Sequence, residues 1–469
     1  MFNNSSSGND VVSSDSFSGP LKRKGFFFGM YQSCYGELNN KVFLIKKNQK
    51  SPKPELKIEI KPTTVIHVYE NEKIPRFVIS NEGESDVCLA AETPDEVMAW
   101  VVALRSATFQ NHVKISMDYF NIISVIGRGF YGKVMLVELK SNGELYAIKT
   151  IHKSRLISSR KVHTVLNERN ILVKANNPFI VQLKYAFQTD TKFYLVMEYV
   201  PGGELFRYIR ENGKLSYHSS ILYVAEIALA LDYLHSIGVI YRDLKTENIL
   251  LGADGHIKIT DFGLSKDLSY LEVTSSFCGT TEYIAPEIIK REHYSYMIDW
   301  WALGILTYEI LFGATPFFNR NRSRMFQAIT NNDPQYPSDT DPNVIDFINK
   351  LLTKDPKKRY GLSQLKNHPF WKGLNFNDVM EKKIKPPFIP DVKDKIPSNF
   401  DSEFTEEPAA DSIASAVEQS SANFPGFSYA AIEIENENNE INRTEESLGS
   451  DLKATEIDPN ITNISTEIE

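Results

Sequence analysis

Cysteine is scarce in this sequence, and the chain begins without a targeting signal. Only three cysteines, Cys34, Cys88 and Cys278, occur among 469 residues, and they lie far apart. That number fits neither a disulfide framework nor a metal-binding motif, so we expect a reducing compartment. The opening residues MFNNSSSGND lack the basic start and apolar centre of a secretion signal, and Phe2 stands where myristoylation requires glycine. We therefore predict a cytoplasmic protein.

Long hydrophobic runs are also missing. The longest apolar stretch, WWALGILTYEILFGA, is interrupted by Glu309 and is too short for a membrane-spanning helix, so it predicts a buried core helix. The net charge of −8 gives no support for binding to nucleic acid. With 42% apolar and 24% charged residues the composition is that of a globular protein, and the length suggests about three domains.

The first part of the chain shows the pattern of a small β-domain. Residues 1–20 are rich in Ser, Asn and Gly, which predicts disorder. Between 21 and 107, short segments such as KVFLI, TVIHV and RFVIS alternate with polar breaks, as antiparallel strands do. The last segment, TPDEVMAWVVALRSA, predicts a helix with a capping box from Thr93 to Glu96 and an apolar face around Trp100.

Composition divides the remainder of the chain. We predict a linker at 108–118 and a larger unit at 119–371, which opens with strands and then becomes helical. Residues 372–430 show little periodicity. Residues 431–469 are rich in Glu and Asn, and we expect them to form a disordered acidic tail.

A glycine-rich segment, IGRGFYGKV, lies near the start of the larger unit. Gly127, Gly129 and Gly132 give the pattern G-x-G-x-x-G, which nucleotide-binding βαβ units also use. Two strand-like segments joined by Asn-Gly follow, which predicts a hairpin whose backbone N–H groups can approach phosphates. The next strand carries Lys149 in an apolar setting, where a lysine needs a partner, and Glu168 in the following helical segment can supply it.

Two further segments carry groups suited to phosphoryl transfer. YRDLKTENILL contains Asp243, Lys245 and Asn248, and ITDFGLSK contains Asp261. A carboxylate can take the proton of an acceptor hydroxyl, and an Asp with an amide oxygen can hold Mg²⁺. Each residue alone fits a turn Asp, a capping Asn or a surface Lys equally well. Their occurrence together, in this order, favours the catalytic interpretation.

These motifs, with an APE sequence downstream, resemble those of the eukaryotic protein kinases over residues 119–371. The resemblance implies a bilobal α+β fold with a β-rich N-lobe and a helical C-lobe. It implies that Asp243 is the catalytic base and that Asn248 and Asp261 bind Mg²⁺. It also matches Asp299 to the central C-lobe helix and pairs Arg359 with Glu287 of the APE sequence.

The same resemblance assigns the ATP site. Lys149 holds the α- and β-phosphates and pairs with Glu168, and Lys245 acts beside the catalytic base. The segment YLVMEYVPGGELF looks like the hinge, in which Met197 is the gatekeeper. The implied ATP contacts are Ile126, Gly127, Arg128, Gly129, Phe130, Tyr131, Gly132, Lys133, Val134, Ala147, Lys149, Met197, Glu198, Val200, Glu204 and Leu250.

Two positions depart from the kinase pattern. Thr246 and Thr281 stand where most kinases have proline, and we expect little effect from either change. Because every catalytic position is filled, the sequence favours an active enzyme over a scaffold that only binds partners.

The sequence also indicates the kinase group and its substrates. Lys245 and Thr280 resemble the Ser/Thr kinases, and YRDLK, FCGT and a C-terminal tail resemble the AGC group. Glu204 and Glu247 match acidic positions that attract arginine upstream of the acceptor, since a carboxylate pairs with a guanidinium in a bidentate way. We expect protein substrates with Arg three, and also five, residues before Ser or Thr.

Three serines match regulatory phosphorylation sites of this group. Ser276 lies two residues before Cys278 in the activation loop, and its phosphate would be received by Arg242 and Lys266, with His163 as a third candidate. The resemblance implies upstream activators such as a phosphoinositide-dependent kinase and a TOR complex.

The other two serines lie in the tail. Phe424, Phe427, Ser428 and Tyr429 match the hydrophobic motif F-x-x-F-S/T-Y/F, which the resemblance places on the N-lobe beside the Glu168 helix. Ser412, seven residues after Thr405, matches the turn-motif site, although proline does not follow it. We expect the whole protein to be a monomer.

Residues 21–107 resemble a pleckstrin-homology (PH) domain, a β-barrel or sandwich capped by one helix. A PH domain, an AGC kinase domain and a tail make up the layout of the protein kinase B (Akt) family, and the tail is also similar to serum- and glucocorticoid-regulated kinases. A phosphoinositide site would use Arg23 and Lys24 on the first strand and Lys41 on the second, but Asn39 stands where a base is expected. Lys22, Lys46 and Lys47 could compensate. Phosphoinositide binding at the plasma membrane, protein binding or autoinhibition, and a purely structural role all remain open.

Overall fold

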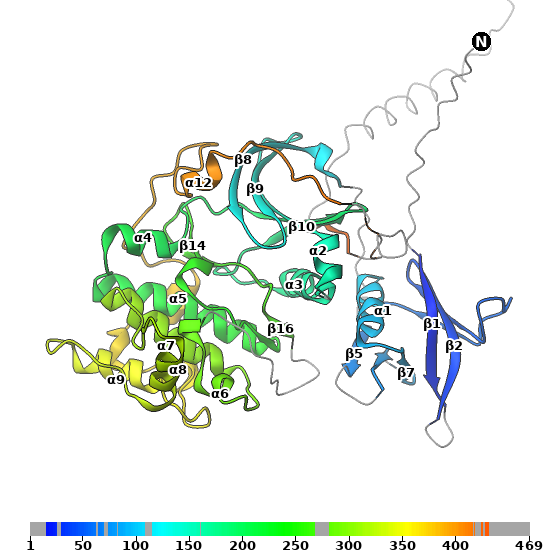
Figure 1. Cartoon of the computed structure of the whole chain (residues 1–469), viewed down its shortest axis with the longest axis horizontal. Helices are drawn as coiled ribbons and strands as arrows, with labels where there is room; N and C mark the ends of the chain where they lie inside the picture. The colour runs from blue at the N-terminus through cyan, green and yellow to red at the C-terminus, as the bar shows by residue number, and fades with distance from the viewer. Residues whose placement is uncertain are drawn as a thin grey trace, which may run out of the picture. The chain divides into compact units, whose positions relative to one another are not determined.

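The computed structural model contains an N-terminal β-rich part, a bilobal part and a tail (Figure 1). It describes residues 16–25, 30–61, 64–69, 74–81, 83–107, 115–159, 161–267, 281–415, 417, 424 and 427–430. Within these ranges, none of the helices has both the length and the apolar character needed to cross a membrane.

The N-terminal part is one antiparallel sheet with one helix. Its strands are β1 (Ser16–Lys24), β2 (Tyr31–Asn39), β3 (Val42–Lys46), β4 (Leu56–Glu59), β5 (Val65–Tyr69), β6 (Arg76–Ser80) and β7 (Val87–Ala90), in the order β4-β3-β2-β1-β7-β6-β5. The helix α1 spans Pro94–Ala107. The predicted antiparallel structure with a closing helix is therefore confirmed.

Trp100 of α1 lies at the centre of this core. It is 3% exposed and packs edge-on against Phe17 at a ring separation of 4.5 Å. On β2 a Cβ added to Gly36 would meet the Trp100 ring at 2.7 Å, so only glycine fits there. The predicted capping box is present, because Glu96 N donates to Thr93 Oγ1 at 3.2 Å and Thr93 N donates to Glu96 Oε2 at 3.2 Å.

The predicted disordered segment 1–20 extends too far. Ser16–Pro20 form the first half of β1 and pair with Tyr35–Asn39 of β2. The polar composition of this segment hides its pairing, because Phe17 is the one large apolar residue among these five and it packs on Trp100.

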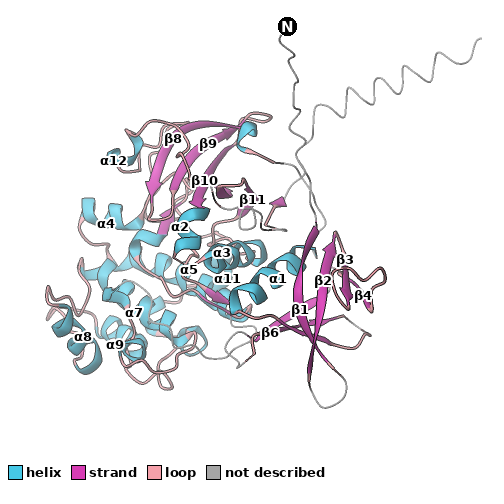
Figure 2. Cartoon of the chain, turned by 45° about the vertical axis from the view of Figure 1, so that its right-hand side comes forward, coloured by secondary structure: helices cyan, strands magenta, loops and turns pink. Residues whose placement is uncertain are grey.

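The N-lobe is a second antiparallel sheet with two helices (Figure 2). Its strands are β8 (Phe120–Arg128), β9 (Lys133–Leu139), β10 (Leu145–His152), β11 (Leu183–Gln188), β12 (Lys192–Glu198) and the tail strand β17 (Tyr429–Ala430), in the order β17-β11-β12-β10-β9-β8. A 3-10 turn, η1 (Met117–Tyr119), leads into β8, and α2 (Lys153–Ser158) and α3 (Val162–Lys174) follow β10.

The C-lobe is helical. Its larger helices are α4 (Leu205–Asn212), α5 (Tyr217–Ser236), α7 (Met297–Phe312), α8 (Arg322–Asn331) and α9 (Pro342–Leu351), with shorter turns η2 (Thr246–Asn248), η3 (Thr281–Tyr283), α6 (Pro286–Ile289), α10 (Leu362–Leu365), η4 (Pro369–Trp371) and α11 (Phe376–Met380). Two small two-stranded sheets, the hairpin β14 (Ile249–Leu251) with β15 (Ile257–Ile259) and the pair β13 (Val239–Ile240) with β16 (Lys266–Asp267), carry the catalytic segments. In the tail, α12 spans Ser402–Thr405.

The predicted core helix is α7. It is apolar on nearly all sides, as a helix in the centre of a lobe must be, and Trp301 is fully buried. The predicted pair of Glu287 and Arg359 is also present, since two guanidinium nitrogens donate to the two carboxylate oxygens at 2.7 and 2.9 Å. Both side chains are almost completely buried, so the bidentate pair is well shielded from water.

Candidate active site

The glycine loop is a strand–turn–strand hairpin, as predicted. Arg128 of β8 and Lys133 of β9 are its last register partners, and Gly129 N donates to Gly132 O at 2.9 Å across the turn. A Cβ added to Gly132 would lie 1.7 Å from the carbonyl oxygen of Thr150 on β10. Glycine at this position therefore allows the loop to approach the neighbouring strand, where no larger residue could fit.

Lys149 of β10 contacts two carboxylates from different segments. Its Nζ lies 2.7 Å from Glu168 Oε1 on α3 and 3.0 Å from Asp261 Oδ1. Burial alone lowers the pKa of Lys149, but Asp261 and Glu168 raise it above its usual value. Lys149 in turn holds the pKa of the Asp261 carboxyl below its usual value. These shifts favour the charged forms of Lys149 and Asp261, whereas burial raises the pKa of Glu168. The short Lys149–Glu168 distance is the predicted pairing.

The catalytic loop brings Asp243, Lys245 and Asn248 together. Asn248 Nδ2 donates to the backbone oxygen of Asp243 at 2.8 Å and to its Oδ2 at 2.9 Å, and Lys245 Nζ lies 3.3 Å from the same Oδ2. Both bonds use the amide nitrogen, so the amide oxygen of Asn248 is available as a hard ligand. Asp299 of α7 fixes the start of the loop, because it accepts from Arg242 N at 2.8 Å where Arg242 has a φ of 68°.

An apolar cluster lies between the glycine loop and the hinge. Ile126, Leu136 and Ala147 are buried, and Val134 packs against them. Phe400 of the tail joins this cluster and stacks on Tyr199 at a ring separation of 5.9 Å. From the sequence alone Phe400 had no predicted role, so this contact was missed.

The other predicted ATP residues lie on β12 and the segment after it, on β14 and in the glycine loop. Met197 and Val200 are buried on the hinge side, and Glu204 forms an isolated bridge with Leu250 of β14. Glu198 directs its side chain to Lys258 at 2.7 Å, which leaves only its backbone for a ligand. Phe130 is exposed at the tip of the glycine loop, next to Tyr131.

Three acidic side chains from separate segments, Glu204, Glu247 and Glu309, influence one another electrostatically. Desolvation and the neighbouring Glu247 raise the pKa of Glu204. Desolvation and Glu247 likewise raise the pKa of Glu309 on α7 to about 7, although Tyr283 donates a hydrogen bond to it. The sequence predicted Glu204 and Glu247 and missed Glu309, whose only signal was a charge inside an otherwise apolar helix.

The predicted receivers of an activation-loop phosphate lie near each other. Arg242 lies two residues after Ile240, which pairs with Lys266 in the β13–β16 sheet, and Arg242 Nε donates to the backbone oxygen of Leu264 at 2.6 Å. His163 is exposed on α3. Ser276 lies outside the described residues.

The hydrophobic motif docks on the N-lobe. β17 extends the sheet by pairing Tyr429 with Ala186 and Ala430 with Tyr185 of β11. Phe427 is fully buried and lies 4.5 Å from the ring of Phe193.

Polar groups hold the same segment. The buried Arg169 of α3, next to Glu168, donates to the backbone oxygens of Phe427 and Ser428, each at 3.2 Å. Gln188 of β11 exchanges two hydrogen bonds with the backbone of Phe424, at 2.6 and 3.1 Å. Ser428 itself is exposed.

A second contact holds the tail midway. Asp411 Oδ2 lies 2.7 Å from Nζ of Lys192, whose side chain is 5% exposed, and accepts from the hydroxyl of Tyr194 at 2.9 Å. The next residue, Ser412, lies with its Oγ 2.8 Å from His152 Nε2. A carboxylate thus stands beside the predicted turn-motif serine.

The N-terminal basic residues do not form the expected set. Arg23 and Lys24 lie on β1 as predicted, but their β2 partners are Gln32 and Tyr31. Lys41 is not on the second strand, because the chain turns at Asn40, which has a φ of 53°, and β3 starts at Val42.

Two of the compensating lysines are also engaged. Lys22 lies 2.8 Å from Glu92, and Lys46 lies 2.7 Å from Glu37. Lys47 lies just beyond β3. The strand β2, YQSCYGELN, contains neither Lys nor Arg.

Two family models match this chain. The model described as the protein kinase domain matches residues 120–371, and the one described as the protein kinase C terminal domain matches residues 398–429. The chain therefore belongs to the protein kinase family. More narrowly, it is an AGC-type Ser/Thr protein kinase with a kinase domain and an AGC C-terminal domain, a family that uses ATP and a divalent metal.

Curated relatives agree with this class. The chain is 42% identical to serine/threonine-protein kinase gad8 of Schizosaccharomyces pombe over 304 residues, which is 64% of this chain and 53% of that protein. It is 42% identical to serine/threonine-protein kinase Sgk2 of Mus musculus over 325 residues, or 66% of this chain and 88% of that protein. It is 39% identical to a RAC family serine/threonine-protein kinase homolog of Dictyostelium discoideum over 361 residues, which is 73% of this chain and 81% of that protein. The chain thus spans about half the length of the fission-yeast kinase.

Proposed function

We propose that this protein transfers the γ-phosphoryl group of MgATP to Ser or Thr residues that follow arginine in protein substrates. The observation that carries the proposal is the joint placement of the Lys149–Glu168–Asp261 ion pairs and the Asp243–Lys245–Asn248 cluster. A scaffold that only bound partners would not require both groups.

The residues present fit a nucleotide and Mg²⁺. Asp261 and the amide oxygen of Asn248 are hard ligands, and Mg²⁺ commonly uses one or two protein groups while phosphates and water complete its shell. When bound, the metal neutralises charge on the phosphates. Because Gly132 has no side chain, the backbone N–H groups of the loop can come close to phosphate oxygens. Lys149 can also donate to phosphate oxygens.

Asp243 is suited to orient and deprotonate the acceptor hydroxyl. Its Oδ2 is held by Asn248 and Lys245, so the carboxylate has a fixed direction. Lys245 lies close enough to share the charge that develops on the transferred group.

The acidic residues support a basic substrate. Glu204 and Glu309 both have raised pKa values, in part because Glu247 stands near each. A guanidinium placed among these carboxylates would relieve their mutual repulsion and could pair with one in a bidentate way. We infer that Glu204 and Glu247 select arginine upstream of the acceptor.

A positional peptide library tests this specificity. The parent protein should prefer Arg three residues before Ser, and the Glu204→Gln and Glu247→Gln variants should lose about tenfold of that preference, because each removes one charged partner. A parent protein with no arginine preference would contradict the proposal.

Regulation is part of the same proposal. We infer that phosphates on Ser276, Ser412 and Ser428, added by upstream kinases, control the active form. Support comes from the exposure of Ser428 on a docked motif and from the adjacent Arg242 and Lys266.

The N-terminal part is proposed to be a PH-like module at 21–107, preceded by β1 residues from Ser16. Its lipid-binding function has weaker support than its protein-binding or autoinhibitory function, because β2 lacks basic residues and Lys22 and Lys46 face carboxylates.

Binding to phosphoinositide-containing vesicles tests the module. If the lipid function holds, Arg23→Ala and Lys41→Ala should each weaken binding relative to the parent protein. If both variants bind vesicles as strongly as the parent protein does, the lipid function is contradicted and the protein-binding function is favoured.

A further inference from the structure

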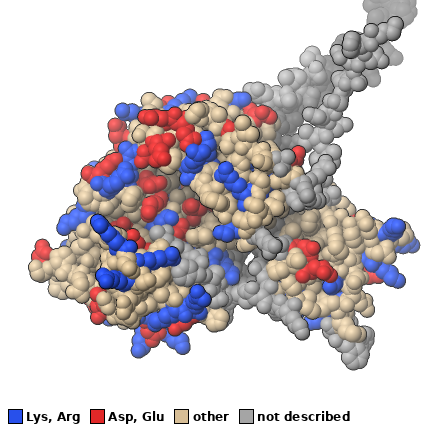
Figure 3. Space-filling model, viewed as in Figure 1, with Lys and Arg blue, Asp and Glu red and all other residues tan. Residues whose placement is uncertain are grey.

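One carboxylate of the tail contacts both basic residues at the mouth of the glycine loop. Glu407 Oε1 accepts from Arg128 Nη1 at 3.1 Å, and Glu407 Oε2 lies 2.7 Å from Lys133 Nζ. The two bases are the last register partners of the β8–β9 hairpin. Figure 3 shows acidic side chains gathered over α12 beside basic side chains over the adjacent strands.

The electrostatics of this contact favour the closed hairpin. Like charges directly opposite each other in an antiparallel pair repel, and a carboxylate between them offsets that repulsion. The side chains of Lys133 and Glu407 are 14% and 20% exposed, whereas that of Arg128 is 60% exposed. The Glu407–Lys133 pair is therefore the better shielded of the two, and its hydrogen bond lowers the pKa of Glu407.

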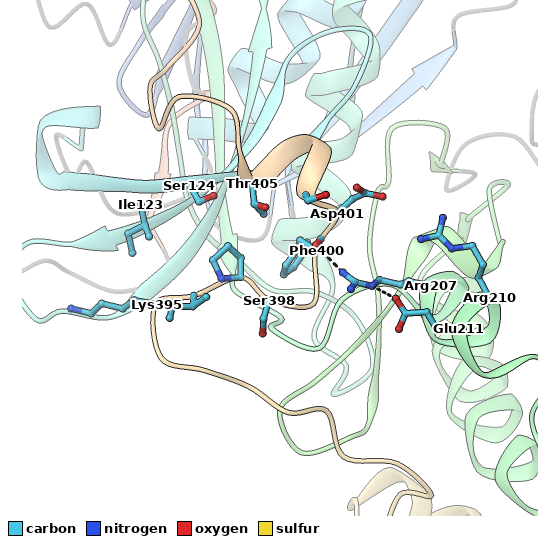
Figure 4. Close-up of a pocket in the computed structure, with 13 residues that line it drawn as sticks. Ile123, Ser124, Arg207, Arg210, Glu211, Lys395, Ser398, Phe400, Asp401 and Thr405 are labelled. Atoms are coloured by element: carbon cyan, nitrogen blue, oxygen red, sulfur yellow. Dashed lines mark hydrogen bonds and ion pairs between the residues drawn. The ribbon is translucent and has the colours of Figure 1, made fainter.

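The tail that carries Glu407 is fixed on the other lobe as well. Arg207 Nη1 of α4 donates to the backbone oxygen of Phe400 at 2.7 Å, and Asn399 Nδ2 donates to the backbone oxygen of Pro201 in the hinge at 3.1 Å. Between these points and Glu407, Thr405 of α12 and Ser124 of β8 both line a pocket of about 630 Å³ (Figure 4). The segment 399–407 thus connects hinge, α4 and glycine loop.

We propose that Glu407 is a positioning residue for the glycine loop, which holds the Arg128–Lys133 end of the hairpin where ATP phosphates must be cradled. It acts through these two bases and does not touch the reacting atoms. The inference rests on the proposed ATP-dependent activity and adds a tail residue that sets the geometry of the phosphate site.

The test compares Glu407→Gln with the parent protein in the full chain. KM for ATP should rise about threefold to fivefold, the range of one exposed to half-buried ion pair, with KM for an Arg-containing peptide unchanged. The dissociation constant for MgADP, measured by calorimetry, should rise equally while the melting temperature stays constant. Glu406→Gln is the matched control, because the exposed Glu406 makes no side-chain hydrogen bond or ion pair in the described part of the chain.

A second substitution separates positioning from a general loss of tail contact. Glu407→Asp keeps a carboxylate opposite Arg128 and Lys133, so it should bind MgADP more tightly than Glu407→Gln does. Nucleotide binding by Glu407→Gln that equals or exceeds that of the parent would overturn the inference while leaving the kinase activity intact. A parent protein that binds no nucleotide would overturn both.

Discussion

The protonation states of Lys149 and Asp261 depend on each other. Lys149 stays protonated because Glu168 and Asp261 face it, and Asp261 stays ionised because Lys149 faces it. Each group is therefore ready for a phosphate or a cation without a prior change in protonation.

Glu309 is a carboxyl group whose protonation changes near neutral pH. Its pKa of about 7 exceeds the usual value, so between about pH 5 and 7 the folded state binds more protons than the unfolded state, and the free energy of unfolding falls as pH rises. The loss across this window should be about 1–2 kcal/mol after allowance for partial exposure. Glu309→Gln should flatten the dependence in melting curves taken at several pH values. An identical slope in the variant and the parent would contradict this assignment.

Sequence patterns predicted residues that act through local neighbours and missed those that depend on distant ones. Thr93 and Glu96 cap one helix three residues apart, so their pattern was visible. Phe400 reaches the apolar cluster around Ile126, and Glu407 reaches Arg128, although both tail residues are more than 250 positions away in the sequence. No local periodicity records such contacts.

Among the elements, the hydrophobic motif shows how a short segment gains structure. β17 has two residues, too few to form a strand alone. It forms because its backbone pairs with the edge strand β11 and because the buried Phe427 packs against Phe193. The family resemblance predicted this docking and the structure contains it. The strand β1 was predicted less well, since its first residues pair with β2 through the backbone and carry few apolar side chains.

Phe427→Ala should undock this strand. Truncating a fully buried phenylalanine in a core costs about 3–5 kcal/mol, which is enough to shift the docking equilibrium. The value of kcat/KM should fall about tenfold, because α3 would lose the contact between Arg169 and the backbone of Phe427. Ile413→Ala is the matched control, since Ile413 belongs to the same tail and is 98% exposed. Unchanged activity of Phe427→Ala would show that docking does not support catalysis.

At the scale of the kinase and its tail, several separate contacts hold the described tail residues in 399–415 and 427–430. They are the hinge contact of Asn399, the glycine-loop contact of Glu407, the Lys192 contact of Asp411 and the sheet contact of Tyr429. Because these contacts lie on different parts of the kinase, we expect the docking of the tail to depend on how those parts are arranged.

Asp411→Asn should loosen the tail without touching the cleft. It would leave the buried Lys192 ammonium without its charged partner, which costs about 1–3 kcal/mol. Amide hydrogen exchange at residues 427–430 should become faster, and activity should fall less than in Phe427→Ala. Ser412→Ala is the comparison, because it keeps the carboxylate, and equal exchange rates in Asp411→Asn and the parent would argue against an anchoring role.

The central claim is that this protein transfers the γ-phosphoryl group of ATP to Ser or Thr residues that follow arginine, with Asp243 as the base that accepts the proton of the acceptor hydroxyl. The most direct measurement is the transfer of label from γ-labelled ATP to two Ser peptides, with Arg or Ala three residues before the acceptor, by the parent protein and by Asp243→Asn. We predict that the parent labels the Arg peptide at least about tenfold faster than the Ala peptide and that Asp243→Asn labels neither above about one hundredth of the parent rate. Equal labelling by the parent and Asp243→Asn, or no labelling by either, would contradict the account.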